Sequence, residues 1–112
     1  MQYLHNPRCS KSRQGLELLQ QNDINFETRL YLKDPLTKSE IEHLVSSLDI
    51  NDVKQMMRIK EPEFKQQNLA SASPEALILA MVATPKLIER PILINGNKAA
   101  IGRPPENMLG IL

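Results

Sequence analysis

Residues 1–22 read MQYLHNPRCSKSRQGLELLQQN and surround the only cysteine of the chain, Cys9. Residues 1–4 are expected to form a short strand, which stops before Pro7 because proline cannot donate to a sheet ladder. Three leucines then recur close to helical spacing and predict a helix from Ser10 to about Asn22. The cysteine is therefore expected between a strand and the first turn of a helix.

A second strand and a well-marked helix are predicted next. Residues 25–31 alternate apolar and polar side chains, with Phe26, Thr28 and Leu30 expected on the covered face. Residues 37–40, Thr-Lys-Ser-Glu, have the form of a capping box, and four apolar residues then recur at helical spacing. The first half of the chain thus predicts the order β-α-β-α.

The second half predicts short helices and one hairpin. The expected features are, in chain order, a short helix around residues 53–57, an irregular stretch around Pro62, helix starts at Ser73-Pro74 and Thr84-Pro85, strands at 91–94 and 98–101, and a last helix opened by Pro104-Pro105. The dipeptide Asn95-Gly96 between the two strands favours a tight two-residue turn.

The predicted order is that of a thioredoxin-like α/β fold. It implies a four-stranded mixed sheet with helices on both faces, plus a helical insertion before the hairpin. A chain of 112 residues fits one domain, residues 1–112, because domains usually contain about 100 to 200 residues.

The composition argues against several classes of protein. Fourteen Lys and Arg against thirteen Asp and Glu give a net charge of +1, which lacks the basic excess expected of a nucleic-acid binder. No apolar run approaches the roughly 20 residues that cross a membrane. One cysteine and two histidines cannot build the usual four-ligand zinc site, so no metal is expected.

Compartment and oligomeric state follow from similar arguments. A single cysteine cannot close an internal disulfide, and the first residues show no apolar signal core, which together favour a cytoplasmic protein. No long exposed apolar segment requires a partner copy, so a monomer is expected.

Positive charge is concentrated in two stretches. Residues 1–16 contain three cations and no acid, and residues 90–105 repeat this pattern with Arg90, Lys98 and Arg103. If the two stretches meet in space, they form an anion site.

The surroundings of Cys9 favour a nucleophile over a buried structural cysteine, whose neighbours are usually apolar. The N-terminus of a helix and nearby cations both stabilise a thiolate. A fall in the thiol pKa from about 8.5 to about 6.5 would raise the ionised fraction at pH 7 roughly 25-fold. His5 would add positive charge if protonated or a hydrogen bond if neutral, and Ser12 would bond either to the backbone or to the thiolate.

Two arginines are candidates for anion binding because of their positions. Arg90 precedes Pro91 at the start of the hairpin, where a cis peptide bond is a candidate, and Arg103 precedes the last helix. Both are expected near the Cys9 end of the sheet, and guanidinium groups hold tetrahedral oxyanions through forked hydrogen bonds. Arg29 and Arg58, taken alone, are interpreted as surface residues.

Residues 5–13, His-Asn-Pro-Arg-Cys-Ser-Lys-Ser-Arg, resemble the active-site segment of the glutathione- and glutaredoxin-dependent arsenate reductases, which have a thioredoxin-like fold. Residues 58–69, 85–92 and 101–106 are similar to later blocks of that family in the same order. The resemblance covers essentially the whole chain.

The resemblance implies an oxidoreductase active in arsenic detoxification, with no bound cofactor. Cys9 would attack arsenate, and His5 and Ser12 would support the thiolate. Arg58, Arg90 and Arg103 would hold the oxyanion. Glutathione, as co-substrate, would resolve the thiol-arsenate adduct, and glutaredoxin would then allow arsenite to leave. A chain with one cysteine agrees with an external reductant, since it has no resolving thiol of its own.

Two alternatives stay open. A glutathione-linked thiol oxidoreductase would act on disulfides with weak or no arsenate activity. A regulator of the related Spx type would bind RNA polymerase, but such regulators usually carry Cys-x-x-Cys, whereas here Ser12 occupies the second position. The three arginines fit an oxyanion enzyme better than a binding module.

Overall fold

The computed structural model describes residues 1–112. The strands are β1 (Gln2–Leu4), β2 (Glu27–Arg29), β3 (Ile92–Asn95) and β4 (Lys98–Ile101). The α-helices are α1 (Ser10–Gln21), α2 (Lys38–Ser47), α3 (Pro62–Gln66) and α4 (Pro74–Ala83). The short 3-10 helices are η1 (Val53–Met56), η2 (Leu69–Ser71), η3 (Pro85–Leu87) and η4 (Pro105–Ile111).

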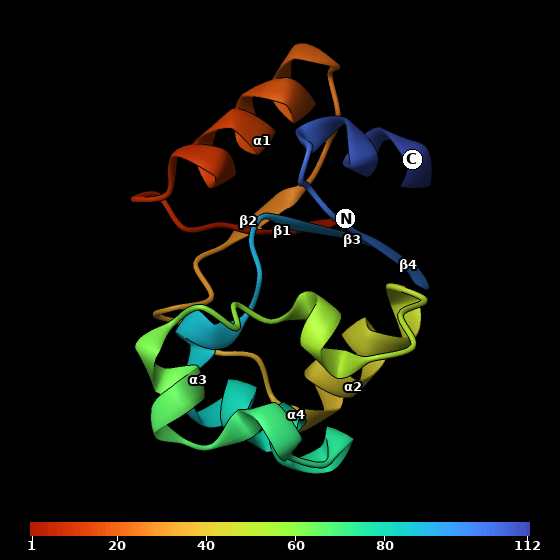
Figure 1. Ribbon diagram of the computed structural model, residues 1–112. Coiled ribbons are helices and arrows are strands. Elements are labelled where there is room, and N and C mark those ends of the chain that lie inside the picture. Colours follow the sequence, from red (N-terminus) through yellow and green to blue (C-terminus); the bar gives the residue numbers. More distant parts are fainter.

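The four strands form one mixed sheet in the order β2-β1-β3-β4. β1 is parallel to β2 and antiparallel to β3, and β3 and β4 form the C-terminal hairpin. Figure 1 shows α1 and η4 on one side of the sheet and α2, α3 and α4 on the other. This arrangement confirms the predicted thioredoxin-like fold with a helical insertion between β2 and β3.

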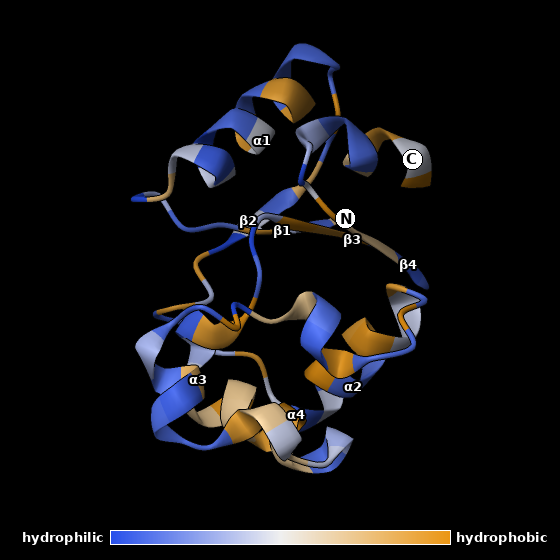
Figure 2. Ribbon diagram, in the orientation of Figure 1, coloured by the Kyte–Doolittle hydropathy of each residue, from blue (hydrophilic) through white to orange (hydrophobic).

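The central strands are buried on both faces, and their side chains divide the core into two parts. Leu4 and Ile92 point into a cluster of 18 buried residues on the side of α2 and α4. Tyr3 and Leu93 point the opposite way, into a small cluster with Leu19 of α1 and a methionine of η4. Figure 2 shows that α1 alternates hydrophilic and hydrophobic bands, whereas α4 is apolar along most of its length.

The predicted starts of α2 and α4 are confirmed at their caps. The Thr37 hydroxyl accepts a hydrogen bond from the Glu40 N–H (3.2 Å), and the Glu40 carboxylate accepts one from the Thr37 N–H (2.9 Å). The Ser73 hydroxyl accepts from the N–H of Ala76 (3.2 Å) at the start of α4. Both caps satisfy helix N–H groups that would otherwise lack partners.

The second strand is shorter than predicted, and the predicted alternation of covered and exposed side chains along it is wrong. β2 ends at Arg29 because the chain turns there, with the N–H groups of Lys33 and Asp34 donating to the carbonyl oxygen of Leu30. Leu30 is 37% exposed instead of covered. Arg29 is not a free surface residue, since its side chain is only 12% exposed and binds both Asp34 and Glu40.

Two further local expectations need correction. The stretch after Pro62 is the helix α3 and not an irregular segment, because proline suits the first turn of a helix. In the hairpin, Asn95 pairs with Lys98, so the turn residues are Gly96 and Asn97. Gly96 has a φ of 61°, and the Asn95 side chain donates to the carbonyl oxygen of Ile111 (2.7 Å), which holds it in the strand.

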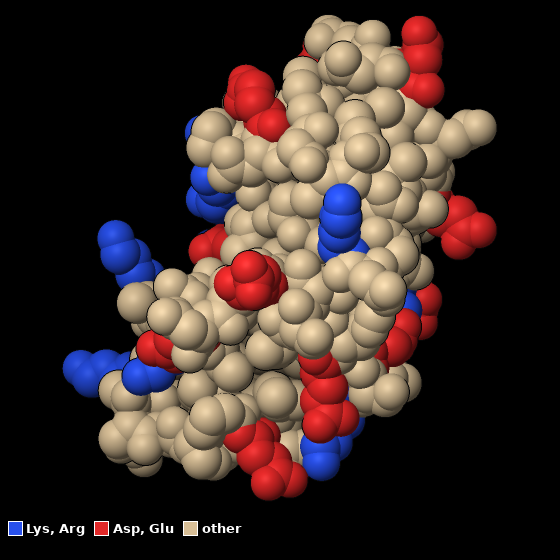
Figure 3. Space-filling view, turned by 90° about the vertical axis from the view of Figure 1, so that its right-hand side faces the viewer, with Lys and Arg blue, Asp and Glu red and all other residues tan.

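Figure 3 shows basic and acidic side chains interspersed on the face in view, with no continuous patch of one sign. None of the helices is both long and apolar enough to cross a lipid bilayer.

Candidate active site

Cys9 lies between β1 and α1, where the sequence predicts it. It is the N-cap residue of α1, with extended backbone, and its N–H donates to the carbonyl oxygen of Asn6 (3.0 Å). Its own carbonyl oxygen accepts from the N–H of Arg13 (3.0 Å), the first bond of the helix. Cys9 is only 8% exposed, so it is largely shielded from bulk solvent.

The environment of Cys9 favours its ionised form. Burial raises the pKa of the thiol, but this effect is outweighed by the backbone N–H of Ser12, the guanidinium of Arg90 and the backbone N–H of Lys11. The net result is a pKa of Cys9 below its usual value. The first turn of the helix and one arginine from a distant part of the chain therefore act together on the thiolate.

His5 and Ser12 form a buried polar network beneath this loop. The Nδ1 atom of His5 is hydrogen-bonded to the Oγ atom of Ser12 (2.7 Å), and the N–H of Asn6 donates to the same oxygen (2.9 Å). Burial, with a smaller effect of the Arg13 charge, lowers the pKa of His5 below its usual value. Of the two roles open to His5, the neutral hydrogen-bonding one fits this environment.

Of the two alternatives for the Ser12 side chain, the structure shows the bond to the backbone. Its hydroxyl bonds to the backbone N–H of Asn6, while its own backbone N–H acts on the thiolate. The carbonyl oxygen of Ser12 accepts a hydrogen bond from the Tyr3 hydroxyl (2.5 Å), and burial raises the pKa of Tyr3 to about 12. Tyr3 therefore stays a neutral donor that supports the first turn of α1 from inside the sheet.

Arg90 reaches the thiol from the strand beside β1. β3 is antiparallel to β1, so Arg90, which precedes β3, lies at the same end of the sheet as Cys9. Its Nε and Nη1 atoms are buried and have no hydrogen-bond partner. The candidate cis peptide bond Arg90–Pro91 is present. Buried guanidinium donors without partners, next to a thiolate, indicate a site for an anion.

Arg103 is joined directly to Arg90. Its Nε atom donates to the carbonyl oxygen of Arg90 (2.8 Å) and lies 3.4 Å from the Oε1 atom of Glu89. The Arg103–Pro104 bond is also cis. Lys98, the third cation predicted in this stretch, lies at the turn end of the hairpin and does not join the two arginines.

Arg58 is held in place by an isolated β-bridge between its neighbour Met57 and Ile88. Its N–H donates to the carbonyl oxygen of Leu87 (2.7 Å), and its guanidinium binds the carboxylate of Glu61 (Nη1–Oε1 2.5 Å). Arg58 is therefore an anchored residue and not the free surface residue that its sequence position alone suggests. A hollow of about 300 Å³ is lined by Met57, Arg58, Ile59, Lys60, Glu89 and Arg103.

Three residues near the arginines were missed by the sequence analysis. Glu61 and Glu89 are the carboxylates that orient Arg58 and Arg103. Tyr31 is buried, which raises the pKa of its hydroxyl to about 12 despite the nearby charges of Arg90 and Arg58. Arg58 and Glu61 lie only three residues apart, which is a local signal for their pairing, whereas nothing local in the sequence predicts the position of Tyr31.

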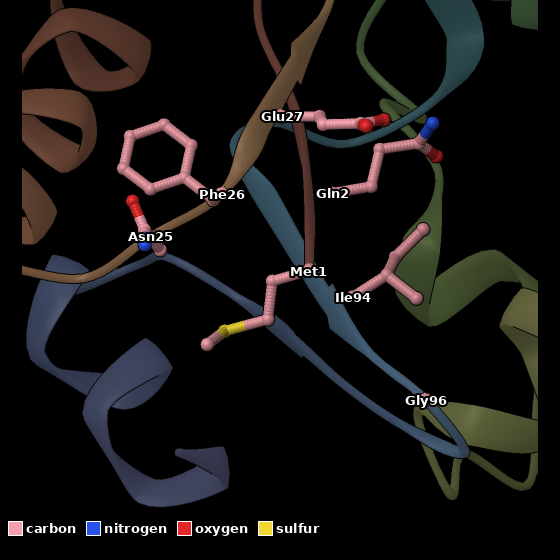
Figure 4. Close-up of a pocket in the computed structure, with 7 residues that line it drawn as sticks. All are labelled: Met1, Gln2, Asn25, Phe26, Glu27, Ile94 and Gly96. Carbon is pink, nitrogen blue, oxygen red and sulfur yellow. The ribbon is translucent and has the colours of Figure 1, made fainter.

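The largest hollow on the surface lies elsewhere. It has a volume of about 590 Å³ and lies at the opposite end of β1, around Met1, Gln2 and Ile94 (Figure 4). Glu27 is the only acidic or basic side chain in its lining, and no nucleophile faces it. No group of three or more His, Cys, Asp or Glu side chains could hold a metal ion. The chemistry-bearing groups are thus gathered at the Cys9 end of the sheet.

These features define a thioredoxin-like protein whose cysteine, at the start of its first helix, has a lowered pKa and faces an arginine. The chain belongs to the ArsC family, whose model matches residues 4–111. It is 46% identical over 110 residues to an arsenate reductase of Haemophilus influenzae, covering 96% of this chain and 95% of that protein.

Two other relatives extend the comparison. Over 110 residues the chain is 50% identical to the uncharacterized protein YfgD of Escherichia coli, covering 96% of this chain and 92% of that protein. The structure of an arsenate reductase from Vibrio cholerae matches with a TM-score of 0.94 at 43% identity, covering 100% of this chain and 98% of that one.

Proposed function

We propose that this protein reduces arsenate to arsenite through a covalent adduct on Cys9. The observation that carries the proposal is the pairing of the Cys9 thiol with Arg90, which helps to lower the pKa of the thiol and whose Nε and Nη1 atoms are buried without partners. An arsenate oxyanion would supply the missing acceptors and place arsenic next to the nucleophile. The names of the relatives from Haemophilus influenzae and Vibrio cholerae support the same substrate.

In the first step the Cys9 thiolate attacks the arsenic atom. A sulfur–arsenic bond forms, one arsenic–oxygen bond breaks, and that oxygen takes up protons and leaves as water, while arsenic stays pentavalent. Arg90, Arg58 and Arg103 are proposed to hold the remaining oxygens and to balance their charge. The His5–Ser12 network would keep the loop in the shape that directs backbone N–H groups at the sulfur.

The reducing electrons come from two external thiols, since the chain has one cysteine. Glutathione attacks the arsenic, a second oxygen leaves as water, and arsenic is still pentavalent. A thiol of glutaredoxin then attacks the glutathione sulfur and forms a disulfide, and the electron pair of the broken arsenic–sulfur bond reduces arsenic to the trivalent state. Water finally replaces Cys9 on arsenic, which releases arsenite and regenerates the thiol.

The test is arsenate-dependent NADPH oxidation by the purified protein with glutathione, glutaredoxin and glutathione reductase. Turnover should require arsenate, glutathione and glutaredoxin, and the Cys9→Ser variant should show none. Ser10→Ala is the matched control, because Ser10 is exposed in the same turn. Arsenate reduction by Cys9→Ser above the uncatalysed background would contradict the mechanism.

Two further measurements separate the alternatives. Turnover of glutathione mixed disulfides without arsenate turnover would identify a glutathione-linked oxidoreductase. A stable complex with RNA polymerase that does not depend on Cys9 would identify a binding module of the Spx type.

A further inference from the structure

A second hollow runs along the loop that carries Cys9. It has a volume of about 430 Å³ and is lined by His5, Asn6, Pro7, Arg8, Leu30, Leu32 and Lys33. One wall is the segment after β1, and the other is the turn after β2. These parallel strands end side by side, and the N–H of His5 donates to the carbonyl oxygen of Arg29 (2.9 Å). Ligands of α/β proteins commonly bind at this edge, beyond the carboxyl ends of parallel strands.

The lining combines exposed apolar groups with free cations. Leu30 is 37% and Leu32 is 43% exposed, although both are large apolar residues. Arg8 and Lys33 are exposed, and neither forms an ion pair with any acid of the chain. The neighbouring acid, Asp34, is engaged by Arg29 (3.3 Å). The groove therefore combines two positive charges without ion-pair partners, Arg8 and Lys33, with two exposed leucines.

The order of the strands places this groove and the arginines on opposite sides of β1. Arg90 and Arg103 flank β3 and β4, on one side of β1. The groove lies between β1 and β2, on the other side. A thiol that enters along the groove would approach arsenic bound to Cys9 without displacing the arginines from its oxygens.

We infer that the groove is the docking site of the small anionic thiol that resolves the Cys9 adduct, which is glutathione in the function proposed above. Its two carboxylates complement Arg8 and Lys33, and the methylene groups of its γ-glutamyl arm suit Leu30 and Leu32. The volume lies within the roughly 300–1,000 Å³ of small-molecule sites. This inference rests on the proposed function for its chemistry and on the groove for its location.

The direct test is binding of S-methylglutathione, which has no free thiol, to the full chain, followed by amide shifts in NMR spectra. Saturable shifts should be confined to the amides of residues 5, 6, 8 and 30–33, and the binding should weaken as salt is added. Lys33→Glu should raise the dissociation constant about tenfold, the effect of about 1.4 kcal/mol. Lys65→Glu, the same charge change at an exposed residue of α3, should leave the constant unchanged.

A kinetic test follows in the coupled assay. Lys33→Glu and Leu32→Ser should raise KM for glutathione, while KM for arsenate and the alkylation pKa of Cys9 stay as in the wild type. An absence of shifts at residues 5, 6, 8 and 30–33 would overturn the inference even if arsenate is reduced. A rise in KM for glutaredoxin alone would overturn it in favour of a protein partner. If arsenate is not reduced, the binding test still decides about the groove.

Discussion

The Nε atom of Arg103 donates a hydrogen bond to the backbone carbonyl oxygen of Arg90 (2.8 Å). The contact joins the end of β4 to the start of β3 and places both guanidinium groups at the Cys9 end of the sheet. Glu89, 3.4 Å from the same Nε atom, fixes the orientation of Arg103 further. The two arginines therefore form a coupled unit, in which Arg90 acts on the thiol and Arg103 is oriented through the Arg90 backbone.

This coupling predicts a binding defect for Arg103→Lys. Lysine keeps the charge but loses the forked donor geometry, so KM for arsenate should rise about tenfold or more. Protection of Cys9 by arsenate against alkylation should weaken by a similar factor. The alkylation pKa of Cys9 should stay constant, because Arg103 is not among the groups that lower it. A fall in kcat with unchanged KM and unchanged protection would contradict this assignment.

The pH dependence of Cys9 alkylation gives a second prediction. Because the pKa of Cys9 is lowered, thiolate persists to lower pH, and the rate should fall only as the pH drops below that pKa. Arg90→Gln removes a hydrogen bond and a positive charge, so the midpoint should move to higher pH. Iodoacetamide labelling from pH 4 to 10, followed by mass spectrometry, would measure this shift.

Arg8→Gln is the control for that shift. Arg8 adjoins Cys9 in the sequence, yet it is exposed and is not among the groups that lower the pKa of the thiol. Its replacement should leave the midpoint close to that of the wild type. An equal shift in both variants would mean that general positive charge, and not the contact with Arg90, stabilises the thiolate.

Because of the hydrogen bonds in the His5–Ser12 network, replacing Ser12 is expected to lower the free energy of unfolding and the ionised fraction of Cys9. Ser12→Ala leaves the N–H of Asn6 and the Nδ1 atom of His5 without their partner in a buried site. Such unpaired groups typically cost about 1–3 kcal/mol of unfolding free energy. Urea denaturation would measure this loss, and the alkylation pKa should rise as the loop loosens. Ser10→Ala, at an exposed position of the same turn, should stay within about 0.5 kcal/mol of the wild type.

Elements with strong local signals were predicted well from the sequence. The capping box at Thr37, the proline after Ser73 and the Pro7 stop each act within a few residues, so their effect does not depend on the rest of the fold. The Cys9 loop was predicted for the same reason, since strand, loop and helix are contiguous. The turn of the hairpin was misplaced by one residue because the Asn95 side chain bonds to Ile111. Local turn preferences cannot predict a contact between residues so far apart in the sequence.

Residues whose surroundings come from distant segments were the ones that local sequence patterns misjudged or missed. Glu89 faces Arg103 only after the hairpin forms, and Arg58 is anchored through the bridge of Met57 to Ile88. Arg29 resembles any surface arginine until the turn after β2 and the start of α2 surround it with acids. In each case tertiary packing determines the burial and partners of a side chain that is ordinary in composition.

The final prediction concerns a glycine of α1. A Cβ atom at Gly15 would collide with the Tyr3 hydroxyl and lie 3.0 Å from the Met108 side chain and 3.1 Å from Pro91. Tyr3 cannot easily move, because it is fully buried and its hydroxyl donates to the carbonyl oxygen of Ser12. Gly15→Ala should therefore destabilise the protein by about 1–3 kcal/mol, although alanine favours helices.

Gly110→Ala is the matched control for this substitution. A Cβ atom at Gly110 meets nothing within 4 Å, so its unfolding free energy should stay within about 1 kcal/mol of the wild type. Because Tyr3 supports the turn that directs N–H groups at Cys9, Gly15→Ala should also raise the alkylation pKa of the thiol, and Gly110→Ala should not. A Gly15→Ala protein as stable as the wild type would show that α1 can move away from the sheet without loss.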